Sequence, residues 1–170
     1  FSEKAIGVEM NSHPNTGFEL LRGNPIFSGK ILGGCIETIY DMFDNSRFND
    51  TVEICSKYNL CPALEEWENK ILLIESSEEK SKPDLYRKMI RALKDYGLFD
   101  VLAGVLVGKP QNEIYYEEYK SILLEEIPNK DLPIVYNINI GHSTPRCIIP
   151  FGVEAEVNAV SYTHLTLPTN

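Results

Sequence analysis

Residues 132–152, LPIVYNINIGHSTPRCIIPFG, contain the pattern around which we expect the chain to fold. The stretch begins with an apolar run that is typical of a buried strand. The run breaks at Gly141, which places His142 on a polar turn before a second apolar run. A histidine at the end of a buried strand is well placed for proton transfer, provided that another group orients its ring.

Two upstream stretches have the same strand character. Residues 70–75 (KILLIE) place four consecutive apolar side chains before Glu75, and the apolar run at 101–107 is closed by Gly108. Continuous runs of this kind indicate strands that are buried on both faces, as in the centre of a parallel sheet. Together with a strand at 133–138, they predict three neighbouring strands.

Helical patterns alternate with these strands. One amphipathic helix is predicted to begin near Pro83 and to end at Gly97, and a second is predicted over 113–127. The order strand, helix, strand, helix, strand is typical of α/β proteins. We therefore expect an α/β fold with a small, mostly parallel sheet flanked by helices. The alternating pattern at 153–158 predicts an edge strand near the C-terminus.

The length of 170 residues fits one domain with short additional segments. The turn-rich residues 1–28 predict a linker or the remnant of an upstream domain. The domain itself is expected over 29–160, where a short strand, a glycine turn and a helix precede the α/β unit. Residues 161–170, including His164, continue no element and have the appearance of a non-native tail, so the prediction of fold and function excludes them.

Composition narrows the expected partners and compartment. The formal net charge is −9, which argues against nucleic acid because phosphate binding requires a basic surface. No apolar stretch reaches about 18 residues, so no membrane partner is expected. The four cysteines lack the spacing of a metal site, and isolated cysteines of this kind are typical of reduced thiols in a cytoplasmic protein. We expect no metal and no cofactor.

The carboxyl ends of the predicted strands contain the candidate functional residues. Ligands of open α/β sheets bind at this edge, and the three strands end at Glu75, at Gly108–Lys109 and at Gly141–His142. A carboxylate beside an imidazole fixes its tautomer and stabilises the imidazolium, as in the orienting half of a hydrolytic triad. The alternative is that Glu75 only caps a loop and that His142 is a structural histidine.

The residues themselves offer no clear nucleophile. Ser143 is adjacent to His142, adjacent residues seldom reach nucleophile–base geometry, and the chain contains no G-x-S-x-G motif. Cys35 follows Gly33 and Gly34 at a predicted strand-to-helix turn, where a helix N-terminus would lower the pKa of a thiol. Cys35 is therefore the one nucleophile-like candidate, and the alternative is that it is a small buried residue.

Five motifs occur in order and at suitable separations along the chain. They are GKILGGCIE at 29–37, KILLIE at 70–75, LFDVLAGVLVGKP at 98–110, PIVYNINIGHSTP at 133–145 and IPFG at 149–152. Over residues 15–158 the chain resembles the C-terminal half of the LD-carboxypeptidase family of serine peptidases. Within that family it is most similar to the branch related to microcin C immunity proteins.

The resemblance implies a Ser–Glu–His catalytic triad. Glu75 stands at the position of the family's glutamate and His142 at that of its histidine, whereas the family's nucleophilic serine belongs to an N-terminal domain upstream of residue 1. Cys35 is then not the nucleophile, and Gly33 and Gly34 are expected to line the substrate-binding cleft. The implied reaction is the hydrolysis of an amide bond near the C-terminus of a small peptide substrate, without a metal or cofactor.

Two substrate types and one competing interpretation follow. The resemblance implies either the L,D-bond of a murein tetrapeptide, cleaved in murein recycling, or the acyl-amide link of a microcin C-like peptidyl nucleotide. It also implies a homodimer. The competing interpretation is a non-catalytic α/β module that binds a small ligand or a partner. It predicts that the side chains of Glu75 and His142 lie far apart.

Overall fold

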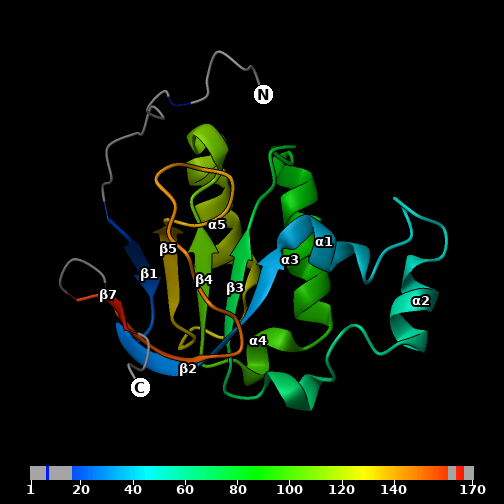
Figure 1. Cartoon of the computed structure of the whole chain (residues 1–170), viewed down its shortest axis with the longest axis horizontal. Helices are drawn as coiled ribbons and strands as arrows, with labels where there is room; N and C mark the ends of the chain where they lie inside the picture. The colour runs from blue at the N-terminus through cyan, green and yellow to red at the C-terminus, as the bar shows by residue number, and fades with distance from the viewer. Residues whose placement is uncertain (1–6, 8–16, 161–163, 167–170) are drawn as a thin grey trace.

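The computed structural model describes Gly7, residues 17–160 and the short strand at 164–166 (Figure 1). These residues form a seven-stranded sheet with the strand order β1-β5-β4-β3-β2-β6-β7. The strands are β1 (Glu19–Arg22), β2 (Ile26–Cys35), β3 (Ile71–Glu75), β4 (Gly104–Gly108), β5 (Ile134–Ile138), β6 (Glu154–Asn158) and β7 (His164–Thr166).

The four central strands confirm the predicted α/β fold. β2, β3, β4 and β5 run parallel to one another, whereas β1 pairs antiparallel with β5, and β6 pairs antiparallel with both β2 and β7. The sheet is therefore mixed, with its parallel part in the centre. β3 and β4 are buried along nearly their whole length, which explains why their sequences are continuous apolar runs. β6 lies where the sequence predicts a strand at 153–158.

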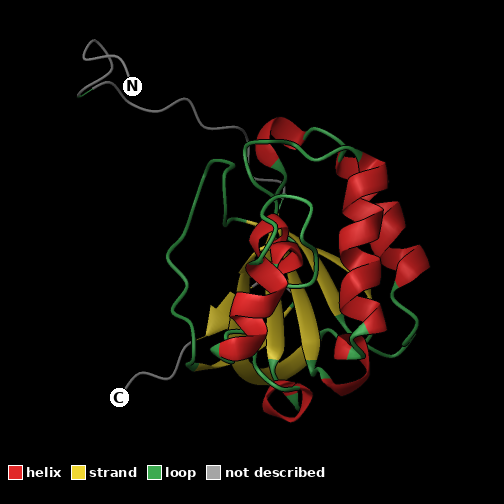
Figure 2. Cartoon of the chain, turned by 90° about the vertical axis from the view of Figure 1, so that its right-hand side faces the viewer, coloured by secondary structure: helices red, strands yellow, loops and turns green. Residues whose placement is uncertain are grey.

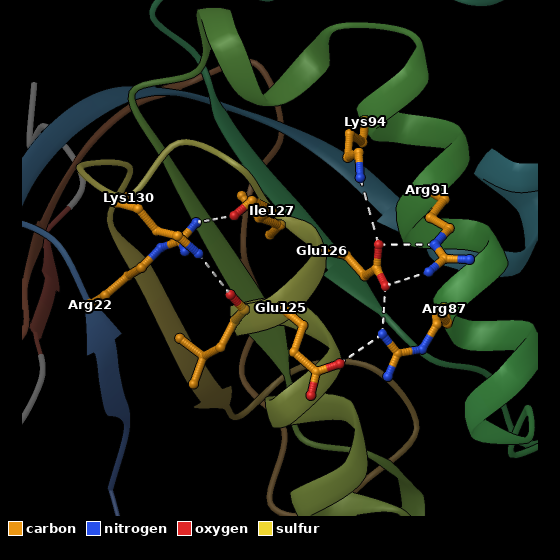
Figure 3. Close-up of polar contacts among 9 residues, drawn as sticks. Arg22, Arg87, Arg91, Lys94, Glu125, Glu126, Ile127 and Lys130 are labelled. Atoms are coloured by element: carbon orange, nitrogen blue, oxygen red, sulfur yellow. Dashed lines mark hydrogen bonds and ion pairs between the residues drawn. The ribbon is translucent and has the colours of Figure 1, made fainter.

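β1 and the start of β2 lie within residues 1–28, for which the sequence predicts a linker. The guanidinium of Arg22, in β1, donates a 3.0 Å hydrogen bond to the carbonyl oxygen of Ile127, directly after α5 (Figure 3). This bond and the pairing with β5 attach β1 to the domain. Residues 164–166 of the predicted tail form β7 and pair with β6, whereas the sequence predicts that the tail continues no element. The other parts of the predicted linker and tail lie largely outside the described residues.

Helices flank the sheet, and α3 and α5 lie side by side on one of its faces (Figure 2). The apolar residues of α3 recur at helical spacing and pack with β3, β4 and β5 in the larger of two cores, and a smaller core lies on the opposite face. The helices are α1 (Ile36–Asp41), α2 (Thr51–Lys57), α3 (Pro83–Asp95), α4 (Leu98–Val101) and α5 (Tyr116–Glu126).

Two predicted boundaries differ from the structure. The strand predicted over 101–107 begins only at Gly104, because the preceding residues form α4 and bury apolar side chains from a helical turn. The helix predicted over 113–127 begins only at Tyr116, because the backbone of Tyr115 has a φ of 59°, which no α-helix contains. In both places the apolar pattern continues across a change of backbone conformation, so periodicity alone misplaces the boundary.

Ion pairs that converge on Glu126 join α3 to α5 (Figure 3). Arg91 binds the Glu126 carboxylate with two nitrogen–oxygen distances of 2.9 Å, Arg87 also donates to it, and Lys94 Nζ lies 3.6 Å away. The hydrogen bonds from Arg91 and Arg87 lower the pKa of the Glu126 carboxyl to about 2. The carboxylate side chain is only 8% exposed, although the cations around it reach solvent.

Replacing Glu126 with glutamine is expected to lower the free energy of unfolding by about 1–2 kcal/mol at neutral pH, because three cations lose their common partner. Since the folded-state pKa of about 2 lies below the ordinary value of 4.5, this stabilisation is present above pH 4.5 and is lost as the pH falls towards 2. Urea unfolding at neutral and at acidic pH measures both effects.

Glu125→Gln is the matched control on the same helix. The Glu125 side chain is 56% exposed and its carboxylate pairs only with Arg87 among the described residues, so we expect a loss below about 0.5 kcal/mol. Equal losses for the two variants would contradict the role of Glu126 as the centre of the cluster.

Candidate active site

The parallel arrangement of the central strands brings four strand ends to one edge of the sheet. Cys35, Glu75, Gly108 and Ile138 end β2, β3, β4 and β5. Cys35 pairs with Glu75 and Gly108 pairs with Ile138 in the register of the sheet. Open α/β sheets bind ligands at this edge, so the predicted site residues meet in a suitable place.

Glu75 and His142 form a hydrogen bond at this edge. Nδ1–H of His142 donates to Oε2 of Glu75 over 2.9 Å, and the side chains are 37% and 12% exposed, respectively. Gly141 makes this contact possible, because its φ is +84° and a Cβ atom there would lie 2.5 Å from Oε2 of Glu75. The competing non-catalytic interpretation requires a large separation of the two side chains, and the 2.9 Å contact does not support it.

The surroundings raise the pKa of both groups. Burial is the largest cause for the Glu75 carboxyl, and it outweighs the lowering effect of the hydrogen bond with His142. For His142 the hydrogen bond to Glu75 is the largest cause of the raised pKa, and it outweighs the opposing effect of burial. The carboxylate therefore favours the imidazolium, as is required of a histidine that takes up a proton during a reaction.

The contact with Glu75 leaves Nε2 of His142 as the atom that can exchange a proton with another group. In the structure, Nε2 lies 3.0 Å from Oε2 of Glu78, whose side chain is 67% exposed in the loop after β3. Ser143 follows His142, but its side chain is buried and its Oγ has no hydrogen-bond partner among the described residues, so it makes no hydrogen bond with the His142 ring. The arrangement therefore corresponds to the orienting half of a hydrolytic triad.

Cys35 does not have the features of an activated nucleophile. Its Sγ donates a 3.1 Å hydrogen bond to Oε2 of Glu37. Burial, as the largest cause, and the neighbouring Glu37 carboxylate raise the pKa of the thiol, whereas the sequence predicts a lowered pKa. That prediction is wrong because burial and the neighbouring negative charge both disfavour the thiolate.

Gly33 and Gly34 lie in different surroundings. Gly34 lines a cavity of about 220 Å³ together with Glu75 and Gly141, and a Cβ atom at Gly34 would meet nothing within 4 Å. Gly33 lines another, apolar pocket of about 230 Å³, and a Cβ atom there would lie 1.9 Å from the carbonyl oxygen of Leu73. The structure thus brings Gly34, but not Gly33, to the cavity beside Glu75.

Lys109 follows β4 at the third strand end that the sequence singles out. Its side chain is 1% exposed, and its Nζ has no hydrogen-bond partner in the part of the chain that the structure describes. Its backbone N–H donates to the carbonyl oxygen of Ile138 over 2.9 Å. Lys109 therefore supports the edge through its backbone, by tying the end of β4 to the start of the His142 loop.

The described ranges, 17–160 above all, contain no group of three or more His, Cys, Asp or Glu side chains that could hold a metal ion. Among the helices in these ranges, none combines the length and the apolar character that crossing a bilayer requires.

Two acidic residues near the edge are not indicated by the sequence. Glu37 is buried and accepts hydrogen bonds from the backbone N–H of Ser77 (3.1 Å) and from Oγ of Ser81 (2.9 Å), so it fixes the loop that carries Glu78. In the sequence, Glu37 resembles any acidic residue in the first turn of a helix. Glu78 lies in a polar loop, where no pattern distinguishes it from Glu79.

The fold and the site define a class of protein, an α/β domain with a carboxylate–histidine pair at the carboxyl edge of its sheet. Residues 28–157 match the sequence profile of the LD-carboxypeptidase C-terminal domain. The chain belongs to this family. It is also 27% identical over 147 residues to a Treponema pallidum protein that carries a provisional carboxypeptidase name, in a match that covers 85% of this chain and 38% of that protein.

Solved structures have the same fold. An MccF-like protein from Streptococcus pneumoniae, solved in complex with AMP, matches with a TM-score of 0.94 and 53% identity over 99% of this chain and 48% of its own. An MccF-like protein from Bacillus anthracis matches with a TM-score of 0.72 and 20% identity over the same shares, 99% and 48%. The chain therefore spans about half the length of these solved relatives, and less of the Treponema protein.

Proposed function

We propose that the chain is the C-terminal domain of a serine-type carboxypeptidase, which hydrolyses an amide bond near the C-terminus of a small peptide or peptidyl nucleotide. The observation that carries this proposal is the 2.9 Å hydrogen bond between His142 and Glu75 in a member of the LD-carboxypeptidase C-terminal domain family. We assign the nucleophile to a serine in the other half of the protein, because neither Ser143 nor Cys35 is placed to act as one.

In the proposed reaction, His142 is the general base and Glu75 orients it. Nε2 of His142 takes the proton from the serine hydroxyl as its oxygen attacks the substrate carbonyl, and then gives this proton to the leaving amine. Water releases the acyl group from the serine by the same two proton transfers. Glu75 keeps the Nδ1 proton in place throughout and stabilises the imidazolium that forms in each transfer.

The solved relatives favour a nucleotide-containing substrate. The Streptococcus pneumoniae protein was solved with AMP, and an MccF structure with 19% identity to this chain was solved with aspartyl sulfamoyl adenosine. We therefore propose a peptidyl nucleotide with an acyl-amide link as the preferred substrate, and a murein tetrapeptide as the second candidate. A cytoplasmic location, a homodimer, and a cleft lined by Gly34 are further parts of the proposal.

Hydrolysis by a two-domain protein tests the proposal. The chain is 53% identical to the Streptococcus pneumoniae relative over the matched region, so it would be joined to the N-terminal half of that relative. Cooperative unfolding would establish that both halves of this chimera fold. We expect this chimera, but not the 170-residue chain alone, to cleave a peptidyl adenosine with an acyl-amide link, as followed by mass spectrometry. A folded chimera that cleaves neither this compound nor a murein tetrapeptide would overturn the proposal.

A further inference from the structure

Both ring nitrogens of His142 are held by carboxylates from the same end of β3. Nδ1 lies 2.9 Å from Oε2 of Glu75, and Nε2 lies 3.0 Å from Oε2 of Glu78. Glu78 therefore occupies the side of the ring that a nucleophile or a leaving group would have to approach.

The two contacts have different requirements for protons. An ionised carboxylate only accepts hydrogen bonds, so both contacts exist together only while the ring is an imidazolium with N–H groups at Nδ1 and Nε2. A neutral ring has one N–H group. It remains at Nδ1, because the Glu75 carboxylate is nearly enclosed whereas Glu78 is 67% exposed and can be hydrated. The lone pair at Nε2 then faces the negative charge of Glu78, and the two groups repel each other.

The loop that carries Glu78 is fixed independently of this contact. Glu37, in α1, accepts hydrogen bonds from the backbone of Ser77 and from the hydroxyl of Ser81, on either side of Glu78. The backbone position of Glu78 is therefore set by α1, while its exposed side chain can turn towards His142 or into solvent. Only a side-chain rotation separates the two arrangements.

We propose that Glu78 is a positioning residue that covers Nε2 of His142 while the ring is protonated and withdraws when Nε2 loses its proton. The inference rests on the proposed function, since Nε2 is the atom that would take the proton of the serine. In the protein without substrate, Glu78 therefore covers Nε2 of the protonated His142. The deprotonation that makes His142 a competent base also uncovers Nε2.

The other charges around the ring are few among the described residues. Glu75 and Glu78 raise the pKa of His142, in that order, and Arg146, in the same loop as His142, lowers it. The negative charge of Glu37 raises the pKa of the Glu75 carboxyl, although burial is the largest cause of that shift. Removing the charge of Glu78 is therefore expected to lower the pKa of His142 without displacing its main partner.

The test is a pH titration of ¹⁵N-labelled histidine side chains by NMR in the 170-residue chain. We expect Glu78→Gln to shift the titration midpoint of His142 to lower pH and to speed the exchange of its Nε2 proton with water at acidic pH. Glu79→Gln is the matched control, because Glu79 is similarly exposed (64%) and pairs with Arg47. It should leave the titration unchanged. The His142→Gln spectrum assigns the signals among the three histidines of the chain.

The chimera supplies a second measurement. Because a lower pKa makes His142 available as a base at lower pH, the acidic limb of the kcat/KM profile should move to lower pH in Glu78→Gln and stay in place in Glu79→Gln. If the titration and the pH profile of Glu78→Gln were both identical to those of the wild type, the inference about Glu78 would be overturned. A different result would contradict the proposed function. If Glu75→Gln left the His142 titration unchanged, Glu75 would not be the partner that orients the ring.

Discussion

Replacing His142 with alanine is expected to reduce kcat/KM of the chimeric protein by about 10⁴-fold or more, chiefly through kcat. Without the imidazole, the serine loses the group that removes its proton, and the leaving amine loses the group that protonates it. The substrate should still bind, so KM should change little. Steady-state kinetics with the peptidyl adenosine substrate measure both constants.

Two further variants locate the effect on the hydrogen-bonded pair. Glu75→Gln keeps the shape of the side chain but removes the charge that stabilises the imidazolium, so we expect a loss of about 10²- to 10⁴-fold in kcat. Glu79→Gln removes a charge from the neighbouring loop without touching the pair, and activity should be retained. Full activity of a folded His142→Ala protein would exclude His142 as the base.

Replacing Gly33 with alanine is expected to have the largest effect on stability, about 3 kcal/mol or more. A Cβ atom at this position would lie 1.9 Å from the carbonyl oxygen of Leu73 and within 3 Å of two further backbone atoms of that residue. Backbone atoms of a paired strand cannot move aside as a side-chain end can, so β2 and β3 would have to separate. Because the total stability of such domains is about 5–15 kcal/mol, this loss would remove a large share of it.

Gly34→Ala separates the effect of the clash from that of backbone strain. Gly33 and Gly34 have similar φ values of 137° and 149°, both unfavourable for alanine, but a Cβ atom at Gly34 would meet nothing within 4 Å. The strain alone should cost about 1–2 kcal/mol. Urea unfolding of both variants gives the difference, and equal losses would show that the close approach of Leu73 is relieved at little cost.

The sequence predicts the centre of the fold well because burial on both faces leaves a continuous apolar run. This is the case for β3, β4 and β5, and it places Glu75 at the end of β3 and His142 shortly after β5 before any contact is known. β1 has only four residues, partly exposed, and its place beside β5 is decided by pairing across more than a hundred residues. Such a pairing leaves no local pattern, so its residues are predicted as part of a linker.

The rest of the candidate site depends on contacts that no local pattern records. Glu78 reaches His142 from a loop that Glu37, in another element, holds by hydrogen bonds to Ser77 and Ser81. The raised pKa of Cys35 depends on burial and on a neighbouring carboxylate, and it reverses the expectation from the helix terminus alone. The two adjacent glycines line different cavities, and the strand pattern does not separate them, because Leu32 and Gly33, which are also adjacent, line the same one.

The paired register of β3 limits where a domain of this kind can change in length. Side chains alternate between the two faces of a strand, so one residue inserted or deleted within β3 would turn the Glu75 side chain towards the face covered by α3 and remove the partner of His142. The loops at 76–82 and 139–153 lie outside this register. The second loop carries Gly141 and His142, so a change in length before His142 would also displace the pair. A change in length that keeps the Glu75–His142 pair intact is therefore expected only outside β3 and outside residues 139–142.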